Sequence, residues 1–266
     1  MLKEPSFFEK AIDGEFEFLI GDRMFLARFI PDPWLLPFKY YYYGVRSLNE
    51  PELYYVKKLV PRRGVAIDIG GFEGLYSYAL AKVSREVHCF EPQPQLAQNI
   101  ERYPNPRIRV HNMGLSDHEG QLTLRIPIIN GVERKAQATF RPLGGPSRAL
   151  KIPVKCLDDF QFTDVTLVKI DVEGLESQVI AGGVETIRRE KPVLLVEIEQ
   201  RHLDPSGLKL EDVFRQILEL GYRGSFLERG NPKDIKYFDY DRHQKPYLDQ
   251  IPHKDYVNNF IFKPES

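Results

Sequence analysis

The 266-residue sequence has little of several features that mark particular classes of protein. Its two cysteines, Cys89 and Cys156, are too few for a disulfide framework or a cysteine-based zinc site. No apolar run reaches the roughly 18 residues of a membrane span, and Met1 to Lys10 lack the apolar core of a signal peptide. The formal net charge of -1 gives no overall attraction to nucleic acid. These absences favour a cytoplasmic protein with no membrane span and no nucleic-acid partner, and they leave a homo-oligomer open.

Short apolar strands alternate with amphipathic helices between residue 64 and about residue 200. Several strands are almost continuously apolar, which is typical of a parallel sheet covered on both faces. The alternation predicts an α/β fold, a doubly wound and mostly parallel sheet with right-handed crossovers. The expected strands are Val65 to Ile69, Glu86 to Phe90, Arg107 to Asn112, Gln121 to Ile126, Val165 to Ile170 and Pro192 to Ile198, and the expected helices are Leu75 to Val83, Pro94 to Arg102 and Leu175 to Arg189.

Residues 1–60 do not show this alternation of strands and helices, and they are predicted to form an N-terminal extension. Glu15 to Ile20 and Met24 to Ile30 flank a Gly-Asp turn and favour a hairpin. A stretch rich in proline and aromatic residues follows, from Pro31 to Tyr43. Asn49 is then expected to cap a helix that continues to Leu59.

Residues 61–266 are predicted to form the α/β domain, which ends in a different pattern. A helix is expected from Leu210 to Leu220, where Gly221 ends it. Ser225 to Leu227 and Tyr256 to Phe262 are expected to be strands that add an antiparallel edge to the sheet.

A glycine-rich turn follows the first strand of this domain, directly after an acid at the strand end. Glycines there let the backbone approach a ligand, and ligands bind beyond the carboxyl ends of such strands. The glycine spacing does not fit the G-x-G-x-x-G pattern of dinucleotide sites. An acid suits a cationic nucleoside such as S-adenosylmethionine, which carries an ammonium and a sulfonium. The predicted cofactor residues of this segment are Asp68, Gly70, Gly71, Glu73 and Gly74.

The next two strands end in further polar residues. Glu91 ends the second strand, where a carboxylate can accept both ribose hydroxyls. Asn112 ends the third strand and Asp117 follows it, in a segment from Gly114 that is predicted to border the adenine; both are predicted cofactor residues. Asp68 alone is equally compatible with a helix cap, but acids at consecutive strand ends together with the glycines indicate a nucleoside cofactor.

These segments resemble the FkbM family of methyltransferases. The matching segments are Asp68 to Gly74, Phe90 to Pro92, Lys169 to Glu176, Val196 to Glu199 and Asn258 to Phe262, and the resemblance covers roughly residues 50 to 263. It implies a class I methyltransferase (Rossmann-like) fold and O-methylation, often of sugars in bacterial glycans or of polyketide hydroxyls. Gly71 departs from the family pattern, which usually has alanine after the first glycine.

Two groups of acids follow the fourth and fifth major strands. They are Asp171, Glu173 and Glu176 after one strand, and Glu197 and Glu199 with the nearby His202 after the next. Adjacent parallel strands bring both groups to one edge of the sheet. Methyl transfer to a hydroxyl requires removal of its proton, so Asp171 and His202 are candidate bases, with Glu173 and Glu197 as further catalytic candidates. A divalent ion held by Asp171, Glu197 and Glu199 is the other route.

Structural explanations remain open for several of these residues. Glu173 and Glu176 also suit a helix N-terminus, because its dipole favours acids. Lys169 suits the structural partner of a nearby acid better than a catalyst. His202 is equally compatible with a loop or a helix cap.

Other functions compete with transfer to a small-molecule or glycan hydroxyl. A nucleic-acid base methyltransferase favours an Asn/Asp-Pro-Pro-aromatic turn where this chain has Asp171 to Gly174, and a nicotinamide oxidoreductase fails on the glycine spacing. A non-catalytic cofactor-binding domain that keeps the fold stays open, since fold alone does not establish function. The acceptor is predicted to bind the aromatic stretch from Trp34 to Tyr43 and the loop from Gly230 to Asp255.

Overall fold

The computed structural model describes residues 30–45, 50–249 and 253–265. The hairpin expected before residue 30 and the expected Asn49 cap lie outside these ranges. No helix within them is both long and apolar enough to cross a membrane.

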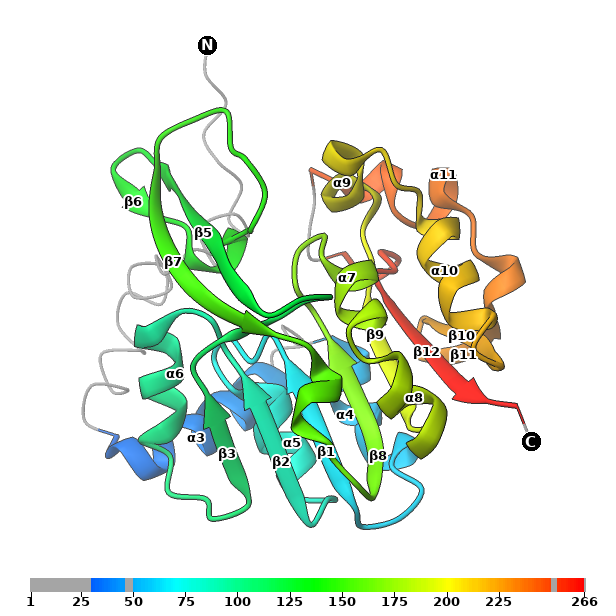
Figure 1. Ribbon diagram of the computed structural model, residues 1–266, viewed down its shortest axis with the longest axis horizontal. Coiled ribbons are helices and arrows are strands. Elements are labelled where there is room, and N and C mark those ends of the chain that lie inside the picture. The colour runs from blue at the N-terminus through cyan, green and yellow to red at the C-terminus, as the bar shows by residue number, and fades with distance from the viewer. Residues whose placement is uncertain (1–29, 46–49, 250–252, 266) are drawn as a thin grey trace.

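An eight-stranded sheet, the main sheet, forms the centre of the fold in the order β11-β10-β12-β9-β8-β1-β2-β3 (Figure 1). The five strands from β9 to β3 run parallel, whereas β12 is antiparallel to β9 and β10, and β11 to β10. The expected mostly parallel sheet with an antiparallel edge is confirmed. Its strands are β1 (Val65–Ile69), β2 (Glu86–Phe90), β3 (Ile108–His111), β8 (Val165–Ile170), β9 (Val193–Glu197), β10 (Tyr222–Glu228), β11 (Asn231–Asp234) and β12 (Asn259–Pro264).

Helices cover both faces of the main sheet, as its apolar strands require. On one face lie α4 (Pro51–Leu59) and α5 (Leu75–Ala81), with α3 (Asp32–Val45) packed against α5. On the other face lie α7 (Glu176–Ala181), α8 (Val184–Glu190) and α10 (Leu210–Leu218). The remaining α-helices are α6 (Pro94–Glu101), beside β3, with α9 (Gln200–Leu203) and α11 (Tyr240–His243).

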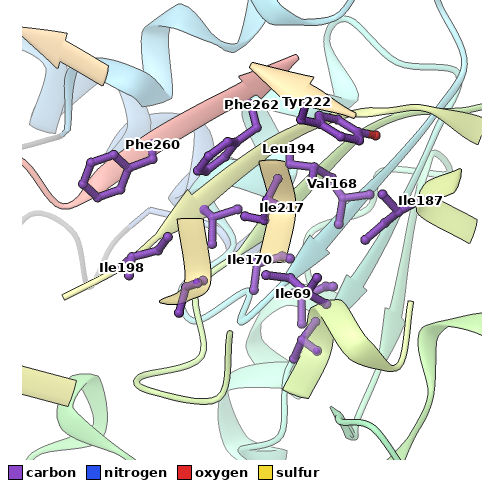
Figure 2. Packing of buried hydrophobic residues seen from close by; sticks show 14 of the residues in the cluster. Ile69, Val168, Ile170, Ile187, Leu194, Ile198, Ile217, Tyr222, Phe260 and Phe262 are labelled. Carbon is purple, nitrogen blue, oxygen red and sulfur yellow. The ribbon is translucent and has the colours of Figure 1, made fainter. Parts of the chain in front are cut away.

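The larger core cluster fills the space between the main sheet and α7, α8 and α10 (Figure 2). Ile69, Val168 and Leu194 come from three adjacent strands and pack in one cluster with Ile187 of α8 and Ile217 of α10, each at most 1% exposed. Because side chains alternate along a strand, every second strand residue joins this cluster and its neighbours face the opposite layer.

Helix α4 belongs to the opposite layer of the core, although the domain boundary expected near residue 60 assigns it to the N-terminal extension. Leu53 and Val56 of α4 pack in the second core cluster with Ala66 and Leu167 of the sheet. The aromatic stretch before it is also helical. In α3, which contains Pro37, Tyr40 packs on rings of α4 and α5.

A four-stranded second sheet is inserted between β3 and β8, in the order β4-β7-β5-β6. Its strands are β4 (Gly114–Leu115), β5 (Gly120–Ile129), β6 (Val132–Glu133) and β7 (Ser147–Lys155). β5 and β7 stand above the carboxyl ends of the parallel strands in Figure 1. The sequence-based prediction had one strand here and missed β7. It also missed the hairpin turn at Asn130 and Gly131, both of which have positive φ.

The single helix expected from Leu175 to Arg189 is wrong, because α7 and α8 are separated at Gly182 and Gly183. A Cβ at Gly182 would lie 2.0 Å from the carbonyl oxygen of Ser116, so the chain passes too closely for a regular side chain. The carboxylate of Asp158 then accepts hydrogen bonds from the first backbone N–H groups of α8, at 2.7 and 3.0 Å. These contacts begin a second helix.

Candidate active site

A cavity lies where the carboxyl ends of β1, β2, β8 and β9 face the second sheet. Ligands of doubly wound sheets bind at this kind of position. The main sheet and its turns contribute Ile69, Gly70, Phe72, Phe90, Glu91, Pro92, Gln93, Asp171, Val172, Glu173 and Glu197, and the second sheet and its loops contribute Gly114, Leu115, Leu124, Lys135, Ala136, Ala138 and Phe140.

The turn after β1 requires glycine at two positions. Gly70 has a φ of +87°, and a Cβ there would lie 1.8 Å from the carbonyl oxygen of Asp171. A Cβ at Gly71 would lie 2.2 Å from the Sγ of Cys89. The buried thiol therefore gives a physical reason for glycine where the resembled family usually has alanine.

Three other predicted cofactor residues surround this turn without lining the cavity. Asp68 is fully buried; its Oδ2 accepts a hydrogen bond from Ser77 Oγ at 2.6 Å, and its Oδ1 has no partner among the described residues. Burial raises the pKa of Asp68. Glu73 pairs with Lys39 at 2.8 Å, and Gly74, at φ +83°, precedes α5. Their contacts hold the turn and the start of α5 in place.

Glu91 lines the cavity at the end of β2 and is only 3% exposed. One carboxylate oxygen accepts the N–H of Phe72 at 2.7 Å, and the other accepts the N–H of Gln93 at 2.7 Å. Burial raises the pKa of Glu91 to about 8. The two backbone bonds fix the orientation of this carboxylate at the cavity wall.

Asn112 and Asp117 lie near this region but outside the cavity wall. Asn112 donates a hydrogen bond from Nδ2 to the carbonyl oxygen of Glu91 at 2.9 Å. Asp117 is exposed and pairs with His118 at 2.7 Å. Asn112 therefore supports the end of β2, whereas Asp117 belongs to a surface pair.

β8 brings a lysine into the acid cluster. Lys169 is 1% exposed, and its Nζ lies 2.8 Å from Oδ2 of Asp171 and 4.4 Å from the ring centre of Tyr76. Burial alone lowers the pKa of Lys169, but the charges of Asp171, Asp68 and Glu197 outweigh it and raise the pKa. Lys169 thus has the nearby acid as partner that the sequence predicts. Across the part of the chain that the structure describes, no three His, Cys, Asp or Glu side chains are arranged to hold a metal ion, so the divalent-ion route has no support.

His202 and Glu173 form a pair beside the cavity. The Nδ1 of His202 lies 2.7 Å from Oε2 of Glu173, which lines the cavity. Burial alone lowers the pKa of His202, but the hydrogen bond and charge of Glu173 raise it. Glu176 instead accepts the N–H of Gly174 at 2.9 Å, at the start of α7. The two acids of this segment thus differ in position and in partners.

The acids at the end of β9 are held by the chain segment before β12. Glu197 lines the cavity and accepts a hydrogen bond from Nδ2 of Asn258 at 2.8 Å. Glu199 is bonded to the hydroxyl of Tyr256 and lies 2.5 Å from Nε of Arg201. Burial raises the pKa of Glu197, and the charge of Asp171 adds to this. For Glu199 burial alone raises the pKa, but the charges of Arg201 and His202 and the hydrogen bonds from Tyr256 and Arg201 together outweigh it and lower the pKa.

The structure brings three sequence-predicted catalytic residues, Asp171, Glu173 and Glu197, to the cavity wall, and the fourth, His202, lies behind the wall as the partner of Glu173. It does not bring the predicted acceptor segments there. No residue of 34–42, or of the described part of 230–255, lines the cavity. Its other side comes from the second sheet, including Lys135 and Phe140, which the sequence analysis missed.

The comparisons with known proteins agree with this geometry. The family model described as the methyltransferase FkbM domain matches residues 66–223. The chain belongs to the FkbM methyltransferase family. This is a family of S-adenosylmethionine-dependent methyltransferases. Membership of the FkbM family accounts for the doubly wound sheet and for the position of the cavity.

Individual relatives of this FkbM-family chain are distant. It is 25% identical over 178 residues to the 2-O-methyltransferase NoeI of Sinorhizobium fredii, an alignment that covers 59% of this chain and 70% of NoeI. A crystal structure of methyltransferase FkbM from Methylobacillus flagellatus is 20% identical, with a TM-score of 0.48, over 80% of this chain. The chain spans 50% of the length of that structure. A precorrin-6y C5,15-methyltransferase from Geobacter metallireducens is 15% identical, with a TM-score of 0.44, over 81% of this chain and 88% of its own.

Proposed function

We propose that this chain transfers a methyl group from S-adenosylmethionine to a sugar hydroxyl of a glycan. The observation that carries the proposal is that one cavity contains Gly70 of the glycine turn, Glu91 and Glu173, with His202 bonded to Glu173. The first two suit a nucleoside cofactor, and the last pair suits proton removal. The name of the relative NoeI, a 2-O-methyltransferase, supports a hydroxyl as the acceptor.

The residues of the turn fit S-adenosylmethionine. At Gly70 the backbone lies so close to the carbonyl oxygen of Asp171 that no side chain fits. The Glu91 carboxylate lies at the cavity wall, where ribose hydroxyls can donate to it. The side chains of Asp68 and Glu73 do not reach the cavity wall. These two residues therefore affect the cofactor indirectly, by holding the glycine turn in place. When bound, the cofactor supplies a methyl group on a positively charged sulfur.

His202 and Glu173 provide a base with a fixed orientation. The Glu173 carboxylate accepts the Nδ1–H of His202, which leaves Nε2 to take the acceptor's proton. Asp171 is the second candidate base, but its carboxylate oxygen Oδ2 is held by the ammonium group of Lys169 at 2.8 Å. We therefore assign proton removal to His202, and to Asp171 the orientation of the acceptor.

Incubation with methyl-labelled S-adenosylmethionine and separate panels of oligosaccharides and polyketide alcohols tests this function. Label should appear as an alkali-stable ether on a sugar hydroxyl. Cofactor binding without label transfer to any acceptor class would favour a non-catalytic domain. Transfer to polyketide alcohols alone would contradict the sugar.

A further inference from the structure

The inserted segment 120–155, which contains β5, β6 and β7, is strongly basic. It has seven Lys or Arg residues and one acid, Glu133, so its formal charge is +6 in a chain whose total is -1, which leaves -7 on the other residues. The basic residues are Arg125, Arg134, Lys135, Arg141, Arg148, Lys151 and Lys155. A charge difference of this size creates a local positive potential despite the near-neutral whole.

This positive segment lies at the candidate active site. Lys135 lines the cavity, and Arg141 donates a hydrogen bond from Nη2 to the carbonyl oxygen of Gly174. Gly174 directly follows Glu173, the partner of His202. Arg141 therefore lies beside the segment that carries the partner of the proposed base, and Lys135 lies at the cavity wall near Gln93, whose Nε2 donates to the Lys135 carbonyl oxygen at 2.9 Å.

One face of the second sheet extends away from Glu173. Thr139 donates from Oγ1 to the carbonyl oxygen of Glu173 at 3.3 Å and pairs across a β-bridge with Arg125. Farther along the face, Arg125 donates to the carbonyl oxygen of Thr123 at 3.2 Å, and Lys151 donates to the hydroxyl of Thr123 at 3.0 Å. Lys151, Arg125 and Arg141 thus form a basic strip that leads to Glu173.

Among the residues that the structure describes, no acid forms an ion pair with a cation of the strip. Arg148 pairs with Glu133 at 2.8 Å, and Lys155 with Glu119 at 3.2 Å. Arg125, Arg141 and Lys151 form no ion pair with any residue that the structure describes, and the buried Nε of Arg141 has no hydrogen-bond partner there. Arg125 and Lys151 are diagonal neighbours on one face, because Arg125 pairs with Ala149 and Lys151 with Thr123. An anionic group bound between them would complement both charges.

We propose that the methyl acceptor is an anionic glycan, whose phosphate or carboxylate groups bind the basic strip while one of its hydroxyls faces His202. Guanidinium and ammonium groups are the usual protein partners of such anions. Nucleic acid fits less well, because single-strand binding also uses aromatic rings, and Phe140, the only aromatic residue of this segment, lines the cavity. The inference rests on the proposed function, since it names the acceptor class of the same site.

Calorimetric titration tests the strip without knowledge of the natural acceptor. The probes are an oligogalacturonate for carboxylate, a mannose-phosphate oligosaccharide for phosphate, maltohexaose as the neutral sugar and a single-stranded RNA. We expect one or both acidic sugars to bind, more weakly as salt increases, and maltohexaose not to bind. The double variant R125Q/K151Q should weaken binding of the acidic sugar about tenfold, which corresponds to about 1.4 kcal/mol.

The matched control is K57Q/R63Q, which removes two exposed cations outside the inserted segment and should leave binding unchanged. If R125Q/K151Q does not fold, the salt dependence of the wild-type chain decides the question. Equal affinity for maltohexaose, stronger binding of RNA, or no effect of salt would overturn the inference. Cofactor binding is titrated separately. Binding of S-adenosylmethionine without binding of any acidic sugar would contradict this inference alone. Failure to bind the cofactor would contradict the proposed function.

Discussion

The main sheet and the second sheet face each other across one cavity and contribute opposite charges to it. The ends of the main strands carry Glu91, Asp171, Glu173 and Glu197, whereas the second sheet contributes Lys135. An acidic wall suits a cationic cofactor and a proton-accepting base, and a basic wall suits an anionic acceptor. The comparison suggests a division of labour in which the main sheet performs chemistry and the inserted sheet selects the acceptor.

The largest expected effect comes from removing the proposed base. H202A should lower turnover by about 10²–10⁴-fold, the usual loss for a general base, while cofactor affinity stays close to that of the wild-type chain. The matched control is H118A, because His118 also pairs with an acid at 2.7 Å but lies on the surface. Comparable loss in both variants, or near-native turnover of H202A, would refute the assignment. D171N, which removes the second candidate base, should keep more activity than H202A.

The pH profile sharpens the same assignment. Glu173 raises the pKa of His202 above its usual value near 6.5, and a base acts only after it has lost its proton. Turnover of the wild-type chain should therefore rise with pH through this raised pKa. E173Q removes the negative charge and should shift the midpoint to lower pH. An unchanged midpoint would mean that another group titrates.

On the cofactor side, E91A should weaken S-adenosylmethionine binding by about 1.5–3 kcal/mol, the range for hydrogen bonds to a charged group. The structure adds a complication, because Glu91 also accepts the N–H groups of Phe72 and Gln93. E91Q keeps an acceptor oxygen and should lose less than E91A. Calorimetry that finds native affinity in E91A would disprove the ribose contact.

The glycine turn gives a smaller effect, on stability. G71A places a Cβ 2.2 Å from Cys89 Sγ and should lower the free energy of unfolding by about 1–3 kcal/mol, as other overpacked cores do. In a C89A background the same change should cost much less. G145A is the control, since a Cβ there meets nothing within 4 Å. Denaturant unfolding that shows equal costs with and without Cys89 would exclude this clash.

The main sheet was predictable because each of its signals is local. Apolar strands such as Val65–Ile69 end in acids or glycines, and parallel strands necessarily bring those ends to one edge. The direction of individual side chains was not predictable. Asp68 and Glu91 end neighbouring strands, yet Asp68 points beneath the turn toward Ser77 and only Glu91 lines the cavity.

The second sheet was harder to predict because its pairing is long-range. The basic residues of β7 are Arg148, Lys151 and Lys155, which do not alternate regularly with apolar ones. The strand pairs with β5 over 27 intervening positions at Thr123 and Lys151. One local signal was overlooked, since Asn130-Gly131 between Ile129 and Val132 is a strong hairpin sequence. The charge of segment 120–155 was hidden by the near-zero total, which shows that charge must be counted by segment.

The smallest effect is expected where the sequence analysis had placed the acceptor. Tyr237 lies in the 230–255 loop, is 63% exposed and does not line the cavity. Y237A should therefore change kcat/KM less than about twofold, because a surface substitution usually changes stability by less than about 0.5 kcal/mol and this side chain does not reach the cavity. Phe140 is the matched aromatic residue of the second sheet, because it lines the cavity and its ring packs against Gly114. F140A should lower kcat/KM roughly tenfold, a loss of about 1.4 kcal/mol, provided that its thermal melt stays close to wild type. Steady-state rates with one acceptor compare both variants directly. A larger loss in Y237A than in F140A would return the acceptor site to the C-terminal loop and end the division of labour between the two sheets.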